Sequence, residues 1–123
     1  MDTGATYPGR PEHISSVRAD LRTLLNGCPI LDDILLCVSE LATNAILHSR
    51  SGLPGSRFIV RSRICPTDRC VIEVQDDGGG WAPAPSDPGY GHGLAIVQAL
   101  ATEWGIDGDH TGRTVWARFD WLK

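Results

Sequence analysis

The sequence predicts an α+β fold in which a largely antiparallel sheet carries helices on one face. Two patterns lead to this prediction: apolar residues recur at helical spacing in three segments, and they alternate with polar residues at strand spacing in four others. The chain has 123 residues, of which 41% are hydrophobic and 21% are charged. This composition suits one soluble domain spanning residues 1–123 with a single core.

The first half of the chain predicts two helices. The first ten residues are expected to form a short strand or a tail, and Pro11 then suits a first helical turn. The first helix ends near Asn26 and Gly27, and the second runs from about Ile30 to Ser49. The core-facing positions are Ile14, Val17, Leu21, Leu24 and Leu25 in the first helix, and Leu31, Ile34, Leu35, Val38, Leu41, Ala42, Ala45 and Ile46 in the second.

The second half predicts two pairs of strands, with a loop and a helix between the pairs. Residues 57–65 and 70–76 alternate apolar with polar side chains, and the short segment between them makes a hairpin turn. A long segment rich in glycine and proline follows, and a third helix then covers residues 93–104. A short strand, a turn at residues 108–112 and a last strand complete the chain. The last strand carries Val115, Ala117 and Phe119 on one face.

Composition and charge argue against several classes of function. The net charge is -4 and the pI is near 5.4, so we expect no basic surface for nucleic acid. No run approaches the roughly 18 apolar residues of a membrane span, and the first ten residues lack the features of a signal peptide. We therefore expect a cytoplasmic protein without a membrane partner. Cys28, Cys37, Cys65 and Cys70 match no zinc pattern and are expected to be reduced core thiols.

Two polar residues interrupt the second helix away from its core stripe. Glu40 and Asn44 lie one turn apart on a shared line of the helix surface, roughly opposite that stripe. An isolated pair of this kind is most often part of a solvated surface. Leu36, Cys37 and Leu47 flank the same line, however, so we interpret this face as the wall of a site.

A carboxylate and several glycines follow the second predicted strand. Asp76 has the parity of the core residues of that strand, so its side chain is expected at the edge of the apolar layer, where it needs hydrogen-bond donors. The glycines at 78–80 let a flat ligand approach closely, although an ordinary turn also explains them. Gly91 and Gly93 open the third helix, where they either cap it or offer free amides to phosphate oxygens.

Taken in order, these motifs resemble the GHKL ATP-binding superfamily of gyrase, heat-shock chaperones, histidine kinases and mismatch-repair ATPases. The resemblance covers roughly residues 30–120, and "SELATNAILHS" is most similar to the bacterial anti-sigma factor serine kinases. It implies the Bergerat fold, a two-layer α/β sandwich with a mostly antiparallel mixed sheet, and binding of ATP with Mg²⁺. The motifs that carry it are Glu40-x-x-x-Asn44, Asp76-x-Gly78-x-Gly80, Gly91-x-Gly93-Leu94 and Thr114 in "GRTV".

The resemblance assigns four residues to the adenine end of the nucleotide. Asp76 would accept a hydrogen bond from the adenine amino group, and Gly78 and Gly80 would admit the base. Thr114 would support the adenine end through its hydroxyl and a water molecule. The segment from Trp81 to Tyr90 would form a lid.

The resemblance assigns the remaining residues to the phosphates and to catalysis. Asn44 would bind Mg²⁺ through its amide oxygen. Gly91, Gly93 and Leu94 would offer main-chain amides to the phosphates. Glu40 would act as the general base on a serine or threonine hydroxyl of a protein substrate.

The four histidines have weaker claims to a role. His48 belongs to the pattern of the family, but its place near the rim of the core stripe favours a packed histidine. His92 lies between two glycines of the phosphate segment and could donate a hydrogen bond to a phosphate. His13 and His110 have no constellation of functional residues around them.

The resemblance implies a regulatory serine/threonine kinase that binds a sigma factor and phosphorylates an anti-sigma antagonist of the STAS type, and it implies a homodimer built from sheet edges and the first helix. One departure concerns charge, because no Lys or Arg occurs between Arg69 and Arg113. The phosphates would then depend on Mg²⁺, helix amides and an arginine such as Arg50 or Arg113, or on a partner's arginine. We therefore expect normal nucleotide binding with slow or partner-dependent turnover.

Two other functions stay open. One is a nucleotide-dependent interaction module with little kinase activity. The other is a detached histidine-kinase catalytic domain, which the absence of a long helical hairpin disfavours. The length disfavours a full chaperone or topoisomerase, since no transducer domain is expected in 123 residues.

Overall fold

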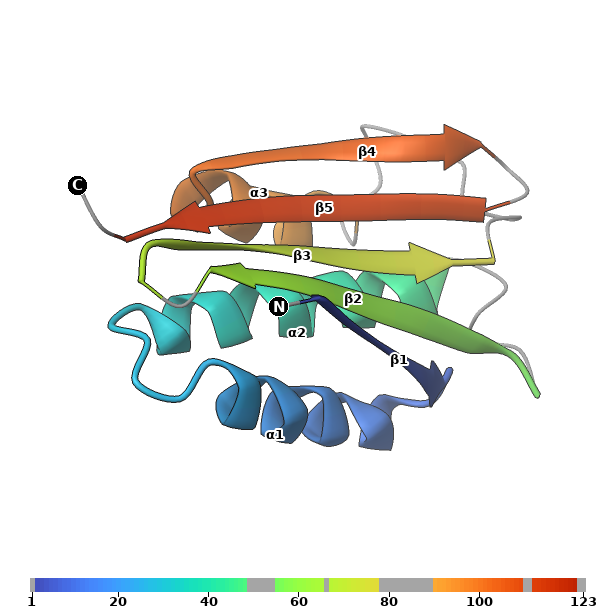
Figure 1. Ribbon diagram of the computed structural model, residues 1–123. Helices are drawn as coiled ribbons and strands as arrows, with labels where there is room; N and C mark the ends of the chain where they lie inside the picture. Colours follow the sequence, from blue (N-terminus) through green and yellow to red (C-terminus); the bar gives the residue numbers. More distant parts are fainter. Residues whose placement is uncertain (1, 49–54, 66, 78–89, 110–111, 122–123) are drawn as a thin grey trace.

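A computed structural model of the chain describes residues 2–48, 55–65, 67–77, 90–109 and 112–121 (Figure 1). After a first strand, the elements follow the order that the periodicities predict. They are β1 (Asp2–Pro8), the 3-10 helix η1 (Pro11–His13), α1 (Ile14–Leu24), α2 (Leu31–His48), β2 (Arg57–Cys65), β3 (Arg69–Asp76), α3 (Tyr90–Leu100), β4 (Glu103–Asp109) and β5 (Gly112–Asp120).

The sheet has five strands in the order β1-β2-β3-β5-β4. Each pair of neighbours in this order is antiparallel, so the sheet formed by the described strands contains no parallel pair. Val74 of β3 lies opposite Val60 of β2 and opposite Val115 of β5, which places β3 at the centre. The two edge strands are β1 and β4.

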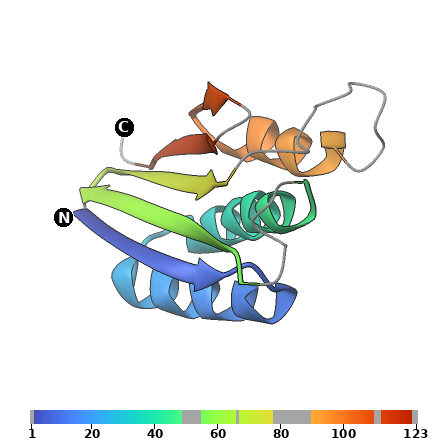
Figure 2. The same ribbon diagram turned by 90° about the vertical axis from the view of Figure 1, so that its right-hand side faces the viewer.

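All three α-helices cover one face of the sheet, and the opposite face is open (Figure 2). α2 contacts β2 and β3, and it also contacts α1 and α3. The layer between helices and sheet is apolar, which stabilises the fold through the burial of large side chains. The most deeply buried of these are Val17, Leu21, Ile34, Leu35, Val38, Leu41, Phe58, Ile64, Ile72, Val97 and Phe119. The predicted α+β fold with helices on one face is therefore confirmed.

The third predicted helix has different bounds in the structure. α3 begins at Tyr90 and ends at Leu100, whereas the sequence pattern placed the helix at residues 93–104. Glu103 and Trp104 belong instead to β4, where Trp104 lies opposite Ala117 of β5. The apolar pattern continues from α3 into β4, so the pattern alone does not show where the helix ends. The end of the helix is decided by the pairing of β4 with β5.

The turn between the last two strands is shorter than predicted. β4 extends to Asp109, so Gly108 lies inside the strand and not in the turn. Gly108 has a φ of +101°, and a β-carbon there would collide with the carbonyl oxygen of Gly112. Only glycine avoids both the strained backbone and the collision.

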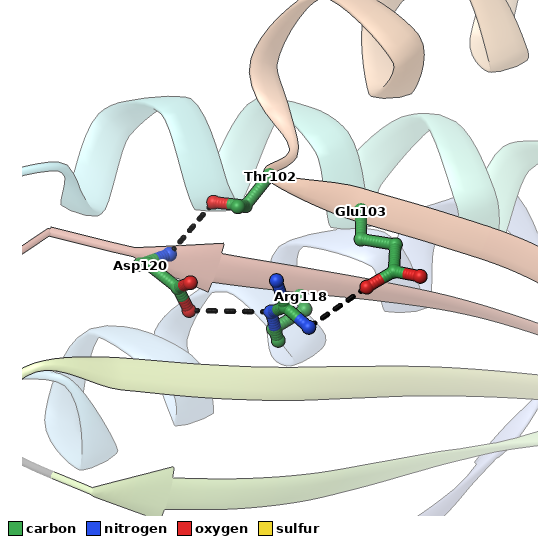
Figure 3. Close-up of polar contacts among 4 residues, drawn as sticks. All are labelled: Thr102, Glu103, Arg118 and Asp120. Atoms are coloured by element: carbon green, nitrogen blue, oxygen red, sulfur yellow. Dashed lines mark hydrogen bonds and ion pairs between the residues drawn. The ribbon is translucent and has the colours of Figure 1, made fainter.

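A polar network joins the start of β4 to the end of β5 (Figure 3). The Asp120 main-chain amide donates a hydrogen bond of 2.9 Å to the Thr102 hydroxyl. Arg118 donates to Glu103 through Nη1 at 2.8 Å and pairs with Asp120 through Nε at 3.4 Å. Because these ion pairs are partly exposed, each contributes about 1 kcal/mol or less to stability.

Candidate functional site

The sequence motifs converge at one end of the sheet. Figure 1 shows the end of α2, the end of β3 and the start of β5 at the same side of the molecule. α2 packs against β3 on one side and against α3 on another. This arrangement brings Asn44 and Asp76 toward the same end of the fold.

Asn44 lies in a partly buried face of α2. Its side chain is only 7% exposed, and it makes none of the hydrogen bonds found among the described residues. Cys37 on the same face is fully buried, whereas Leu36 and Leu47 are 43% and 65% exposed. The face is therefore a boundary between core and solvent, and its interpretation as the wall of a site stays a prediction. The amide of Asn44 has no partner among the described residues, so it is available to a ligand.

Glu40 lies one turn before Asn44 on α2 and is partly exposed. Burial raises the pKa of the neighbouring Cys37 thiol to about 11, with smaller contributions from the negative charges of Asp33 and Glu40. Glu40 is therefore close enough to Cys37 for its charge to act on the thiol.

Asp76 is the last residue of β3, and its side chain is 4% exposed. It follows the alternation of Cys70, Ile72 and Val74, which are all buried on the helix side of the sheet. The prediction that strand parity directs this carboxylate to the core side is therefore confirmed. A carboxylate at this depth requires hydrogen-bond donors, which is the property an adenine-binding group needs.

Thr114 does not join Asp76 on the core side of the sheet. The register of β3 and β5 places Thr114 opposite Gln75 and places Arg113 opposite Asp76. Side chains alternate along a strand, so Thr114 points to the open face while Val115 is buried. Thr114 is thus one position along β5 from the residue opposite Asp76, and its predicted contact with the adenine end through a water molecule stays a prediction. Arg113 is the residue of β5 that the register brings beside Asp76.

The two glycines that are predicted to contact phosphates lie in the first turn of α3. Gly91 and Gly93 follow Tyr90, the first residue of the helix, and Leu94 is half-buried in the next turn. The first four amides of an α-helix have no partner within the helix, so this turn offers donors to an anion. α3 packs against α2 and buries Val97 completely, which holds the turn in place.

Several predicted features fall outside the described residues. These are Gly78 and Gly80, the lid segment as far as residue 89, Arg50 and His110. The side chains of His48 and His92 lie outside the described part as well.

The donor set fits a magnesium ion that arrives with a nucleotide. In the described ranges, no group of three or more His, Cys, Asp or Glu side chains is arranged to hold a metal ion. Mg²⁺ commonly uses one or two protein oxygens together with phosphate oxygens and water. The amide of Asn44, buried and without a described partner, is suited to supply such an oxygen. The described cysteines are all free thiols.

Among the described residues, no helix combines the length and apolar composition that crossing a bilayer requires.

Comparison with known proteins links this arrangement to one family. A family model described as the histidine kinase-like ATPase domain matches residues 7–119 of the chain. A search of curated protein sequences gave no match. Among solved structures, the chain is similar to the RsbU and RsbW domains of Rv1364c from Mycobacterium tuberculosis, with a TM-score of 0.75 and 22% identity. This match covers 97% of the chain and 32% of that structure, so it shows a shared fold.

Proposed function

Because the chain belongs to the histidine kinase-like ATPase domain family, we propose that it is an ATP-binding regulatory serine/threonine kinase of the anti-sigma factor type. Its substrate would be an anti-sigma antagonist of the STAS type, and its second partner a sigma factor. The observation that carries the proposal is Asn44, a buried amide with no hydrogen bond among the described residues, one turn after Glu40.

The nucleotide would be held from both ends. Asp76 would accept a hydrogen bond from the adenine amino group, in agreement with its burial on the helix side of the sheet. Gly78 and Gly80 would leave room for the base, and the main-chain amides of Gly91, Gly93 and Leu94 near the start of α3 would donate to phosphate oxygens. The amide oxygen of Asn44 would bind Mg²⁺, which neutralises phosphate charge when it is bound.

Glu40 would remove the proton from the attacking hydroxyl of the protein substrate. Its partial exposure supports this role, since a hydroxyl on another protein must reach it from solvent. Its position one turn from Asn44 would keep the base close to the metal-bound phosphates. A general base of this kind contributes about 10²–10⁴-fold to the rate of the chemical step.

A phosphotransfer assay with matched variants tests the proposal. The protein is incubated with Mg²⁺ and labelled ATP and with a STAS-type antagonist from the same organism, and phosphorylated sites are mapped by mass spectrometry. Glu40→Gln should lower the rate at least about 100-fold while ATP binding persists. Glu73→Gln, on the open face of β3, is the matched control and should react like the wild type. Equal rates for Glu40→Gln and the wild type would exclude Glu40 as the base.

The alternative is a nucleotide-dependent interaction module with weak catalysis. The observation that favours it is the absence of Lys and Arg between Arg69 and Arg113, which removes the cations that usually stabilise phosphoryl transfer. In this case ATP would change the affinity for a sigma factor, and no phosphorylated residue would be found on any partner. The same assay, combined with partner binding measured with and without ATP, separates the two functions.

The proposal also includes a single cytoplasmic domain over residues 1–123 that forms a homodimer through sheet edges and the first helix. The exposed edge strand β1 and its neighbour α1 supply suitable elements for this contact. Light scattering at micromolar concentration would give twice the 13.3 kDa mass of the chain if the homodimer forms.

A further inference from the structure

The start of β5 brings a positive charge to the end of β3. These two strand ends lie beside each other (Figure 1), and the register pairs Arg113 with Asp76 there. Directly opposite residues of an antiparallel pair have β-carbons about 4.5–5.5 Å apart on the same face of the sheet. This separation is short enough for the long arginine side chain to reach a group that the Asp76 carboxylate binds. The two side chains are therefore neighbours at one site.

Strand parity directs both side chains to the helix side of the sheet. Asp76 continues the buried alternation of β3 and is 4% exposed. Arg113 lies two residues before Val115, which is buried on the helix side of β5, and Arg113 itself is half-buried. The pair lies in the middle of the sheet, away from the edge strand β1 and from α1, so a homodimer formed through those elements leaves it accessible to a nucleotide.

The surroundings of the pair suit the flat face of a purine. Gly108 of β4 lies opposite Arg113 on the other side, and it carries no side chain beside the arginine. A β-carbon at Gly108 would lie 3.0 Å from the Arg113 α-carbon, so any other residue would crowd this side. The next row on the same face is apolar, because Val74 lies opposite Val115. Asp76 and Arg113 therefore form a charged border beside an apolar surface, the combination that a heterocyclic base requires.

The hydrogen-bonding groups of this pair match one edge of adenine. Adenine carries a donor, the 6-amino group, next to an acceptor, the ring nitrogen N1. An ionised carboxylate only accepts hydrogen bonds, and a guanidinium only donates them. Asp76 and Arg113 therefore present an acceptor beside a donor, the complement of this edge. Guanine carries a carbonyl oxygen at the 6-position and an N–H group at N1, so the same placement of the ring would set acceptor against acceptor and donor against donor.

We propose that Arg113 is a base-reading residue that donates a hydrogen bond to N1 of adenine while Asp76 accepts one from the 6-amino group. The two residues together select ATP over GTP. This inference rests on the nucleotide site of the proposed function, and it assigns Arg113 to the base and not to the phosphates. The phosphates then depend on Mg²⁺, on the amides at the start of α3 and on a cation from elsewhere.

Calorimetric titration with base-modified nucleotides tests this assignment on the full chain in the presence of Mg²⁺. The probes are ATP, GTP, 1-deazaadenosine triphosphate, in which a C–H group replaces N1, and purine riboside triphosphate, which lacks the 6-amino group. The wild type should bind each of the two analogues at least about tenfold more weakly than ATP, because each analogue loses a hydrogen bond to a charged group. GTP should also bind at least about tenfold more weakly, because its groups oppose those of the protein.

Two variants and one control connect the preference for N1 to Arg113. Arg113→Met removes the donor, so it should bind ATP about tenfold more weakly than the wild type and should bind 1-deazaadenosine triphosphate as tightly as ATP. It should still prefer ATP over purine riboside triphosphate, because Asp76 is intact. Arg113→Lys keeps a donor and should recover part of the preference for N1, and this variant decides the question if Arg113→Met does not fold. Arg63→Met makes the same substitution on the open face of β2 and should bind all four nucleotides like the wild type.

Three results would overturn the inference, and they separate it from the proposed function. Equal affinity of the wild type for ATP and 1-deazaadenosine triphosphate would show that no group donates to N1. An unchanged preference for ATP over this analogue in folded Arg113→Met would show that another group is the donor. In both cases ATP still binds, so the proposed function stands. Failure of the folded wild type to bind any of the nucleotides would overturn the proposed function together with the inference.

Discussion

Alkaline pH should destabilise this domain through its buried thiols, and Cys70 isolates the effect. Burial raises the pKa of Cys70 from its usual 9.0 to about 12, with smaller contributions from Cys28 and Asp120. Between these two pH values the unfolded chain has lost a proton that the folded chain keeps, so the free energy of unfolding falls as the pH rises. Each pH unit above the usual pKa of 9.0 lowers the free energy of unfolding by about 1.4 kcal/mol. At about pH 11 the loss therefore reaches about 2.7 kcal/mol.

Replacing Cys70 by alanine should reverse the order of stability across this range. Near neutral pH the variant leaves a small cavity and should be less stable than the wild type by about 1 kcal/mol. By about pH 11 the wild type has lost about 2.7 kcal/mol that the variant keeps. The variant should then be more stable than the wild type by about 1.7 kcal/mol, after subtraction of its cost of about 1 kcal/mol. Urea unfolding followed by tryptophan fluorescence, in reducing buffer at several pH values, measures both curves.

Cys65→Ala is the matched control, because Cys65 is an exposed free thiol on the adjacent strand. This control should keep the pH dependence of the wild type. A constant difference between Cys70→Ala and the wild type at every pH would refute the reasoning.

Three further substitutions test packing and polar contacts. Gly105→Ala would place a β-carbon 2.8 Å from three atoms of the Trp116 ring. It should lower the free energy of unfolding by about 1–2 kcal/mol and shift the tryptophan emission. Unchanged emission would contradict this contact. Tyr7→Phe removes the hydrogen bond to Asp20 and should lower the free energy of unfolding by about 1 kcal/mol in urea titrations, whereas no change would show that the bond contributes nothing. Arg118→Met removes two partly exposed ion pairs and should cost about 1 kcal/mol, less at high salt; a cost that salt does not reduce would argue against an electrostatic origin.

The features that could be predicted from the sequence depend on local periodicity. The burial of Asp76 follows from the alternation of buried and open side chains along β3, which can be read from the sequence of this strand alone. The core stripe of α2 likewise follows from helical spacing, and Ile34, Val38 and Ala42 are fully buried.

The features that could not be predicted depend on contacts between distant segments. The register of β3 and β5 decides that Arg113, and not Thr114, lies opposite Asp76, and one residue of slip changes the face of the sheet. The pairing of β4 with β5 likewise decides that Trp104 belongs to β4 and not to the preceding helix.

The central claim is that Asp76 and Asn44 belong to a nucleotide site, and calorimetric titration with Mg²⁺ and ATP tests it most directly. The wild type should bind. Asp76→Asn should lose binding because the adenine amino group would no longer donate to a charged carboxylate, and Glu40→Ala should bind like the wild type. Circular dichroism must show that each variant is folded. Failure of the folded wild type to bind, or wild-type affinity in Asp76→Asn, would contradict the account.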